Sequence, residues 1–280
     1  MESDPHYAMS VVREADADRY ISVLYAPQDK RAALFALYAF NAELAGIRDR
    51  VSEPLPGAVR LQFWRDVLTA GAASETIEGA PIAVALLEAV RAFRLPVQPL
   101  LDLIDAREFD LYDDPMPSRN DLEGYCGETA SALIQMAGLV LDAPAAMRMA
   151  ELAGHAGCAQ AIAGLLRLLP IHRRRGQCYV PADLLQAAGT SREALLVGEE
   201  GAARAVAAMV ALGRDHASRF EEGARGLPAA LRPAFLPAGL ARAYLDRITG
   251  KEAKALDKSL TIPQWRKHWL MFNRAMRGWN

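Results

Sequence analysis

Apolar residues recur along this chain at spacings of three and four, and no stretch shows the alternation of a half-buried strand. Between Asp29 and Val51, for example, Leu34, Leu37 and Leu44 fall on one helical face. Prolines and glycines divide the remainder into further helices. These are expected near residues 57–71, 81–93, 99–110, 120–143, 145–169, 202–223 and 233–248, and after Pro263. The pattern predicts an all-α protein, with the Ala- and Gly-rich segment 145–169 as its central helix and Pro170 as the end of that helix.

Composition narrows the class of protein. The chain has 280 residues and is 52% hydrophobic, which is enough to bury one large core. A net charge of −2 gives no overall field for nucleic acid, so we expect no nucleic-acid partner. No apolar run reaches the roughly 20 residues of a membrane span, and the first residues show no signal-peptide pattern. These features favour a cytoplasmic protein, at most peripheral on the inner face of a membrane.

The reactive side chains form no recognisable local site. Cys126, Cys158 and Cys178 lack a C-x-x-C spacing, which favours buried thiols in a reducing compartment over a disulfide or zinc framework. His155, His216 and His268 are isolated in sequence, and no Ser-His-Asp or Cys-His arrangement follows from their spacing. The pair Asp102 and Asp105, with Asp110, raises an alternative metal site, but no partner cluster is visible.

Five segments resemble, in order, segments of the squalene and phytoene synthases. They are Asp18–Leu44, Arg60–Leu68, Leu103–Leu111, Leu122–Leu133 and Arg174–Pro181. The resemblance implies a single-domain isoprenoid-synthase helical bundle around a central cavity, spanning residues 18–280 after an N-terminal extension of residues 1–17. In that family two aspartate-rich motifs face each other across the cavity and hold Mg²⁺ on a prenyl diphosphate, whose departure the metal assists.

This chain departs from both motifs. After Phe40, the positions of the paired aspartates hold Ala45 and Gly46, and only Asp49 remains. Aligned on Arg167, the second motif falls on Gly164, Leu168 and His172. Leucine cannot ligate Mg²⁺, and histidine suits so hard an ion poorly. We therefore expect no catalytic residues and no bound metal, so no cofactor.

Basic residues beside the second motif are candidates for binding a diphosphate or an anionic head group. They are Arg167, Arg173, Arg174 and Arg175, with Tyr179 in the Tyr-x-Pro sequence that follows. The alternative is that the arginines form a solvated turn and that Tyr179, like Tyr125, serves packing.

The last helix carries an aromatic stripe. Its members recur at spacings of three and four: Trp265, Trp269, Phe272, Met276 and Trp279. The residues Arg266, Lys267, Arg274 and Arg277 lie off this stripe. Such a helix fits a membrane surface or a docking partner, while closure of the bundle core is the alternative that periodicity leaves open.

The stretch Ala39–Pro54, followed by Arg60–Leu68, is most similar to a non-catalytic branch of the family, the mitochondrial complex I assembly factor 6-like proteins. This resemblance implies a factor that assists assembly of respiratory complex I, with complex I subunits, other assembly proteins, a membrane surface or a prenyl lipid as partners. One alternative is an active prenyltransferase making a head-to-head C30 or C40 isoprenoid, with Mg²⁺ as its cofactor. The other is a carrier of a prenyl lipid or quinone.

Overall fold

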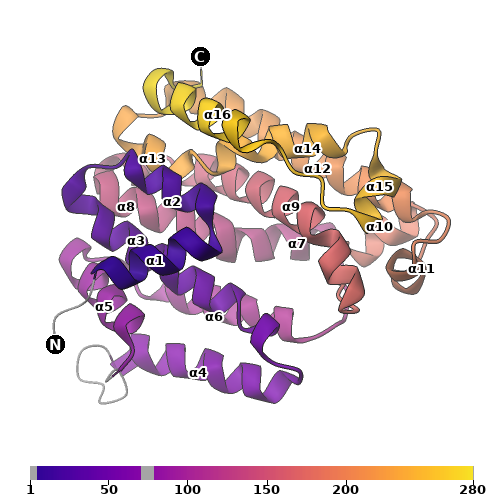
Figure 1. Ribbon diagram of the computed structural model, residues 1–280, viewed down its shortest axis with the longest axis horizontal. Helices are drawn as coiled ribbons and strands as arrows, with labels where there is room; N and C mark the ends of the chain where they lie inside the picture. The colour runs from indigo at the N-terminus through magenta and orange to yellow at the C-terminus, as the bar shows by residue number, and fades with distance from the viewer. Residues whose placement is uncertain (1–4, 71–78, 280) are drawn as a thin grey trace. The chain divides into compact units, whose positions relative to one another are not determined.

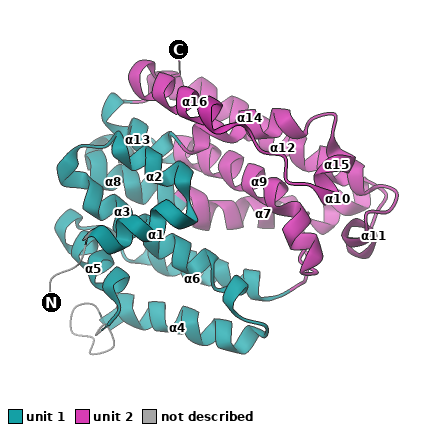
Figure 2. Cartoon of the chain, viewed as in Figure 1, with its two compact units in different colours: residues 1–112, 132–150, 228–236 teal, residues 113–131, 151–227, 237–280 magenta. Residues whose placement is uncertain are grey.

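Helices build the structure throughout the residues described, which are 5–70 and 79–279 of this computed structural model. Within those ranges every regular element is an α-helix, a 3₁₀ turn or a π turn, so the all-α prediction is confirmed (Figure 1). Contacts group the chain into two units (Figure 2). The first unit comprises residues 1–112, 132–150 and 228–236, and the second comprises residues 113–131, 151–227 and 237–280.

The first unit is organised around one helix. Its helices are α1 (Pro5–Ala15), α2 (Ala17–Leu24), α3 (Gln28–Ala45), α4 (Pro54–Ala70), α5 (Pro81–Phe93), α6 (Gln98–Glu108), α8 (Ala132–Met147) and α13 (Arg232–Phe235). Every residue of α3 from Ala33 to Asn41 is buried, because α1, α2, α5, α6 and α8 all contact this helix. A helix that is apolar on all sides is stable only when it is enclosed in this way. The segment before residue 18, expected as an extension, supplies α1 to this packing.

The second unit contains the longest helix of the chain as described. Its helices are α7 (Arg119–Cys126), α9 (Ala150–Arg174), α10 (Ala182–Ala187), α11 (Arg192–Val197), α12 (Ala202–Gly223), α14 (Ala241–Ile248), α15 (Glu252–Asp257) and α16 (Gln264–Arg277). Glycine lets α12 approach α9, since a Cβ on Gly213 would lie 2.9 Å from Ile162 Cγ2. Helix α12 also contacts α14 and α15, and the same Gly213 lies close to Leu245 of α14.

The expectation that Pro170 ends the central helix is wrong. Helix α9 continues through Pro170 to Arg174, because a proline removes only its own N–H bond and the following residues keep theirs. The helix stops at Gly176, which adopts φ +76. There Gln177 N–H donates to His172 O over 2.9 Å and Gly176 N–H to Arg173 O over 3.1 Å, the pattern of a glycine-terminated helix. Arg173 and Arg174 therefore lie in the last turn of the helix, and Arg175 lies in the turn that follows it.

Other prolines also act differently from expectation. Pro54 begins α4, where the fixed φ of proline suits a first turn. The helix expected over 233–248 is broken at Pro237 into α13, a 3₁₀ turn and α14. Of the two residues that could cap the helix expected from residue 120, Asn120 and Ser118, the structure uses Ser118. Its side chain accepts from Asp121 N–H, and the Asp121 carboxylate accepts from Ser118 N–H in return, which forms a capping box.

Two described helical stretches are long and apolar enough to cross a membrane by length and composition alone, contrary to the sequence expectation. They are Arg119–Met147 and Ala150–Arg174, and 56% of each apolar window is buried inside the structure. Core helices of water-soluble proteins pass the same test, so the finding is weak support for a membrane span.

Candidate functional site

The positions that the resemblance assigns to the first aspartate motif lie where α3 ends. Ala45 is the last residue of α3, and Gly46 follows as its cap at φ −83 and ψ −3. Asp49 is exposed in the 3₁₀ turn Arg48–Arg50. Carboxylates four residues apart share a face only along an uninterrupted helix, and here the α-helix stops between positions 45 and 49. Backbone and sequence therefore both depart from a paired-carboxylate site.

Acidic side chains near this end are held by arginines. Arg50 Nη2 donates to the Glu43 carbonyl over 2.7 Å and to Glu43 Oε2 over 3.0 Å. The Asp110 carboxylate is buried and accepts from Arg107 Nη1 over 3.0 Å. An arginine-bound carboxylate is already neutralised, which weakens its value as a metal ligand.

The alternative metal site on α6 is divided among separate partners. Asp102 Oδ1 accepts from Gln98 Nε2 over 2.8 Å, while Asp105 pairs with Arg65 at 2.7 Å. Among the described residues, no group of three or more His, Cys, Asp or Glu side chains is arranged to hold a metal ion.

The positions that the resemblance assigns to the second motif lie on one face of α9. Gly164, Leu168 and His172 follow one another at four-residue intervals, so they share that face. A Cβ on Gly164 would meet no atom within 4 Å, and Leu168 is 38% exposed, so this side of the helix is open. His172 is half-buried, with its ring 4.7 Å from that of Tyr179. Gly164 and Leu168 thus contribute an open surface without a carboxylate to this face of α9.

The candidate anion-binding arginines Arg167 and Arg173 contact different parts of the structure. Arg167 Nη1 donates to Tyr244 Oη over 3.1 Å, and its guanidinium lies 4.9 Å from the centre of that ring. Arg173 donates to the Leu196 and Leu256 carbonyls and binds Asp257 Oδ1 at 2.9 Å. It thus ties the end of α9 to α11 and α15.

Arg174 and Arg175 are exposed at the end of α9. Tyr179 is buried between the rings of His172 and Tyr125, the latter at 6.1 Å. The structure therefore brings Tyr179 to His172 and leaves two of the arginines accessible at the surface.

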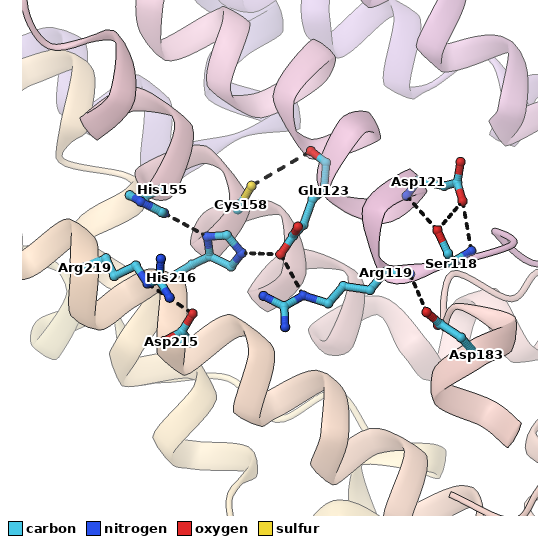
Figure 3. Close-up of polar contacts among 10 residues, drawn as sticks. All are labelled: Ser118, Arg119, Asp121, Glu123, His155, Cys158, Asp183, Asp215, His216 and Arg219. Carbon is cyan, nitrogen blue, oxygen red and sulfur yellow. Dashed lines mark hydrogen bonds and ion pairs between the residues drawn. The ribbon is translucent and has the colours of Figure 1, made fainter. Parts of the chain in front are cut away.

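The residues that sequence reasoning missed form a polar chain across α7, α9 and α12 (Figure 3). His216 lies between two partners: its Nδ1 is 3.1 Å from His155 Nδ1 and its Nε2 is 2.9 Å from Glu123 Oε1. Arg119 Nε donates to the same Glu123 oxygen over 2.9 Å. Arg119 and Glu123 are one helical turn apart, but the contacts of His216 with His155 and Glu123 span 61 and 93 residues, so no local spacing signals them.

Electrostatics explains how this chain of side chains stays paired. Burial acts to raise the pKa of Glu123, but the hydrogen bonds from His216 and Arg119 outweigh it and lower that pKa. Burial and the neighbouring His216 lower the pKa of His155. If Glu123 accepts from His216 Nε2–H, neutral His216 presents an Nδ1 acceptor to His155 Nδ1–H. Two protonated imidazoles would face N–H to N–H, so the pair carries at most one positive charge.

A π turn, Gly127–Ser131, adjoins this network. Ser131 is pressed against α9, where a Cβ on Gly157 would lie 2.4 Å from Ser131 N. Cys158, the next residue of α9, has its thiol pKa lowered by a hydrogen bond from Cys126, which outweighs the opposing effect of burial. The three cysteines are buried thiols that form no disulfide, as the sequence suggested.

The comparisons with known proteins decide the family. The family model described as squalene/phytoene synthase matches residues 12–271, nearly the whole chain. The chain belongs to this family. Its segments Asp18–Leu44 and Arg174–Pro181, which suggested the relationship, both lie within the match.

Relatives within the squalene/phytoene synthase family fall into two groups. The chain is 31% identical to the complex I assembly factor 6 of Bos taurus, over 94% of this chain and 82% of that protein. It is 24% identical to the 15-cis-phytoene synthase of Synechococcus elongatus, over 89% of this chain and 84% of that protein. A dehydrosqualene synthase crystal structure matches with TM-score 0.82 and 18% identity, covering 96% of this chain and 94% of the other, which confirms the expected fold.

The structure shows which residues of the aromatic stripe on α16 are exposed and which are buried. Trp265, Trp269, Phe272 and Met276 are 71%, 60%, 57% and 63% exposed. Trp279, by contrast, is buried with its ring 5.4 Å from that of Phe220. Placing Trp279 on the same surface was wrong, because α16 ends at Arg277 and the chain turns at Gly278. Two basic residues of α16 face inward: Lys267 lies over the Tyr244 ring, and Arg274 reaches Glu221.

Proposed function

We propose that this chain is a non-catalytic member of the squalene/phytoene synthase family that assists the assembly of respiratory complex I, the NADH:quinone oxidoreductase. The observation that carries the proposal is the match to the bovine assembly factor, which reaches 31% identity over 94% of the chain. The match to a phytoene synthase is weaker, at 24% over 89%. Its partners would be complex I subunits or other assembly proteins, met in the cytoplasm at the inner face of the membrane.

The residues at the motif positions support a role without catalysis. Ionising a prenyl diphosphate requires concentrated positive charge on the leaving group, which Mg²⁺ supplies when carboxylates hold it. Ala45, Gly46 and Leu168 offer no carboxylate at the family's positions, and the nearby Glu43 and Asp110 are bound by arginines. We therefore assign no cofactor and no catalytic residue to the chain.

A genetic experiment tests the proposal. The gene is deleted in its host, and NADH:quinone oxidoreductase activity and the amount of assembled complex are measured in isolated membranes. We expect both to fall and to return when the wild-type gene is restored. Succinate:quinone oxidoreductase activity serves as the control for general membrane damage. Unchanged complex I activity and subunit levels would contradict the proposal.

The relationship to phytoene synthases makes prenyl transfer the second candidate function. Purified protein is incubated with farnesyl or geranylgeranyl diphosphate and Mg²⁺, with and without NADPH, and the extracted lipids are analysed by mass spectrometry. We expect no C30 or C40 product. A magnesium-dependent product would establish an active prenyltransferase, whereas tight binding of a prenyl diphosphate or quinone without turnover would indicate a carrier.

A further inference from the structure

Helix α16 presents its apolar side chains to solvent. At 100° per residue, Trp265, Trp269, Phe272 and Met276 fall within an arc of about 60°, and all are more than half exposed. We call these four residues the outer stripe. Exposed hydrophobic residues are ordinary when scattered singly, but a contiguous aromatic set marks a surface that binds something.

The opposite side of α16 holds the helix to its own unit with polar and apolar contacts. Met271 is fully buried, and Lys267 is 8% exposed with its ammonium 5.5 Å from the centre of the Tyr244 ring. Arg274 reaches Glu221 Oε1 at 3.5 Å, and burial lowers its pKa. The helix thus turns two cations inward and its aromatic residues outward, which reverses the usual arrangement of a surface helix. Folding alone gives no reason for this arrangement.

Charge identifies the kind of surface that fits the outer stripe. Residues 258–279 contain no Asp or Glu but include Lys258, Arg266, Lys267, Arg274 and Arg277, although the chain as a whole has net charge −2. Arg266 and Arg277 are exposed, and both lie on the same flank of the stripe. A cationic edge beside a band of Trp and Phe is complementary to a sheet of phosphates over acyl chains.

We propose that α16 is a docking surface for a lipid bilayer that contains anionic phospholipids. The outer stripe enters the boundary between head groups and acyl chains, while Arg266 and Arg277 bind lipid phosphates at its edge. A protein groove would accept the aromatic residues equally well. A segment without a single acidic residue, however, matches the uniform negative charge of such a membrane better than the mixed charges of a protein surface. This inference does not rest on the proposed function.

Vesicle binding tests the inference with the full chain. Sedimentation is measured with vesicles of phosphatidylcholine alone and with an equimolar mixture of phosphatidylcholine and phosphatidylglycerol. We expect binding to the mixed vesicles that weakens with added salt. The double variant Trp269→Ser, Phe272→Ser should weaken binding about tenfold or more, because two large apolar side chains no longer leave water. Arg266→Gln with Arg277→Gln should weaken it roughly fivefold per arginine.

The chain offers a matched control. Leu55 and Val59 on α4 are 75% and 63% exposed and lie one turn apart, as exposed apolar residues unrelated to α16. The double variant Leu55→Ser, Val59→Ser should bind vesicles as the wild type does. Thermal unfolding followed by circular dichroism checks that each variant remains folded, which the exposure of these positions leads us to expect.

Tryptophan emission gives a second readout. Trp64 and Trp279 are buried at 6% and 9% exposure, whereas Trp265 and Trp269 are exposed, so a blue shift and quenching by brominated lipid report on α16. The inference is overturned if wild-type protein binds neither vesicle, if it binds neutral and anionic vesicles equally, or if the outer-stripe variant binds as strongly as wild type. Loss of a protein complex in that variant, with vesicle binding intact, would assign the stripe to a protein partner instead.

Discussion

Helices α3 and α16 carry apolar residues at the same spacing but meet opposite surroundings. In α3, Leu34, Leu37 and Phe40 are at most 1% exposed, enclosed by neighbouring helices. In α16, Trp269 and Phe272 are 60% and 57% exposed. Spacing identifies which residues share a face, but it does not identify what covers that face.

The residues opposite the apolar face distinguish the two helices. Around α3 the remaining positions are also small or apolar, so no side of its middle section is suited to water. Around α16 the opposite side carries Lys267 and Arg274, whose aliphatic stems pack while their charged ends find Tyr244 and Glu221. A helix can therefore be attached through its basic side chains and keep its aromatic residues for another surface.

The largest effect we expect is from opening the interior around α3. Phe40→Ala removes a fully buried ring that lies 5.0 Å from the Trp64 ring, and should lower the free energy of unfolding by about 3–5 kcal/mol. Urea unfolding measures it. Phe272→Ala on α16 is the matched control and should change stability by less than about 0.5 kcal/mol. Equal losses for the two variants would remove the distinction between these helices.

Two tryptophans sharpen the comparison within one chain segment. Trp279→Ala should cost about 2–3 kcal/mol of unfolding free energy, somewhat below a central core position because the Trp279 side chain keeps 9% exposure. Trp269→Ala should be nearly neutral, since its ring is already in water. Thermal or urea unfolding of both variants measures the difference. A costly Trp269→Ala would mean that the outer stripe supports the fold.

Acid should weaken the second unit through its His and Glu network. The pKa of His155 is lowered in the folded state, so the unfolded chain binds more protons below the ordinary value of 6.5 and stability falls as pH drops through that range. The pKa of Glu123 is lowered below 4.5, so its contribution is lost at still lower pH. Urea midpoints measured from neutral pH downward should fall in two stages.

The two stages can be separated by substitution. His155→Gln should flatten the first stage, whereas His268→Gln, at an exposed position of α16, should leave the profile unchanged. A first stage that persists undiminished in His155→Gln would show that another group controls it.

The smallest effect we expect is from the remaining aspartate of the first motif. Asp49→Ala should change stability by less than about 0.5 kcal/mol, because Asp49 is exposed, and it should support complex I assembly as the wild type does. Asp110→Ala is the contrasting variant, since it strips Arg107 of a buried partner and should be clearly destabilising. A large functional loss in Asp49→Ala at normal stability would instead indicate retained metal chemistry.

Prolines and glycines predicted helix boundaries correctly where tertiary packing did not oppose them. The helices expected over 81–93 and 202–223 are α5 and α12 with the same bounds. Pro81 opens α5, whereas α12 passes after Gly223 directly into the 3₁₀ turn Ala224–Gly226. Pro170 misled because a buried helix tolerates one missing hydrogen bond when its neighbours keep theirs. A single residue type is a reliable boundary only where packing does not oppose it.

The sequence proposes positions for a site but not the contacts that those positions make. Sequence comparison named Ala45, Gly46 and Leu168, since motif spacing is local. It could not show that Arg173 anchors α11 and α15, or that His216 joins His155 to Glu123, because those partners lie 23 to 93 residues away along the chain. Contacts of this length depend on how helices are arranged, which no short window of sequence encodes.

The close approach of Gly157 to Ser131 means that any side chain introduced at position 157 would collide with the π turn. Because the nearest neighbours of a Cβ at 157 include backbone atoms, no trimming of Ser131 makes room for it. One added methyl group must therefore separate α9 from the π turn. His155 and Cys158 move with α9, so Gly157→Ala would disturb the contacts of His155 with His216 and of Cys158 with the Glu123 carbonyl without altering any of these residues. The absence of a side chain at position 157 therefore sets the distance between α9 and the π turn, and with it the geometry of the neighbouring polar network.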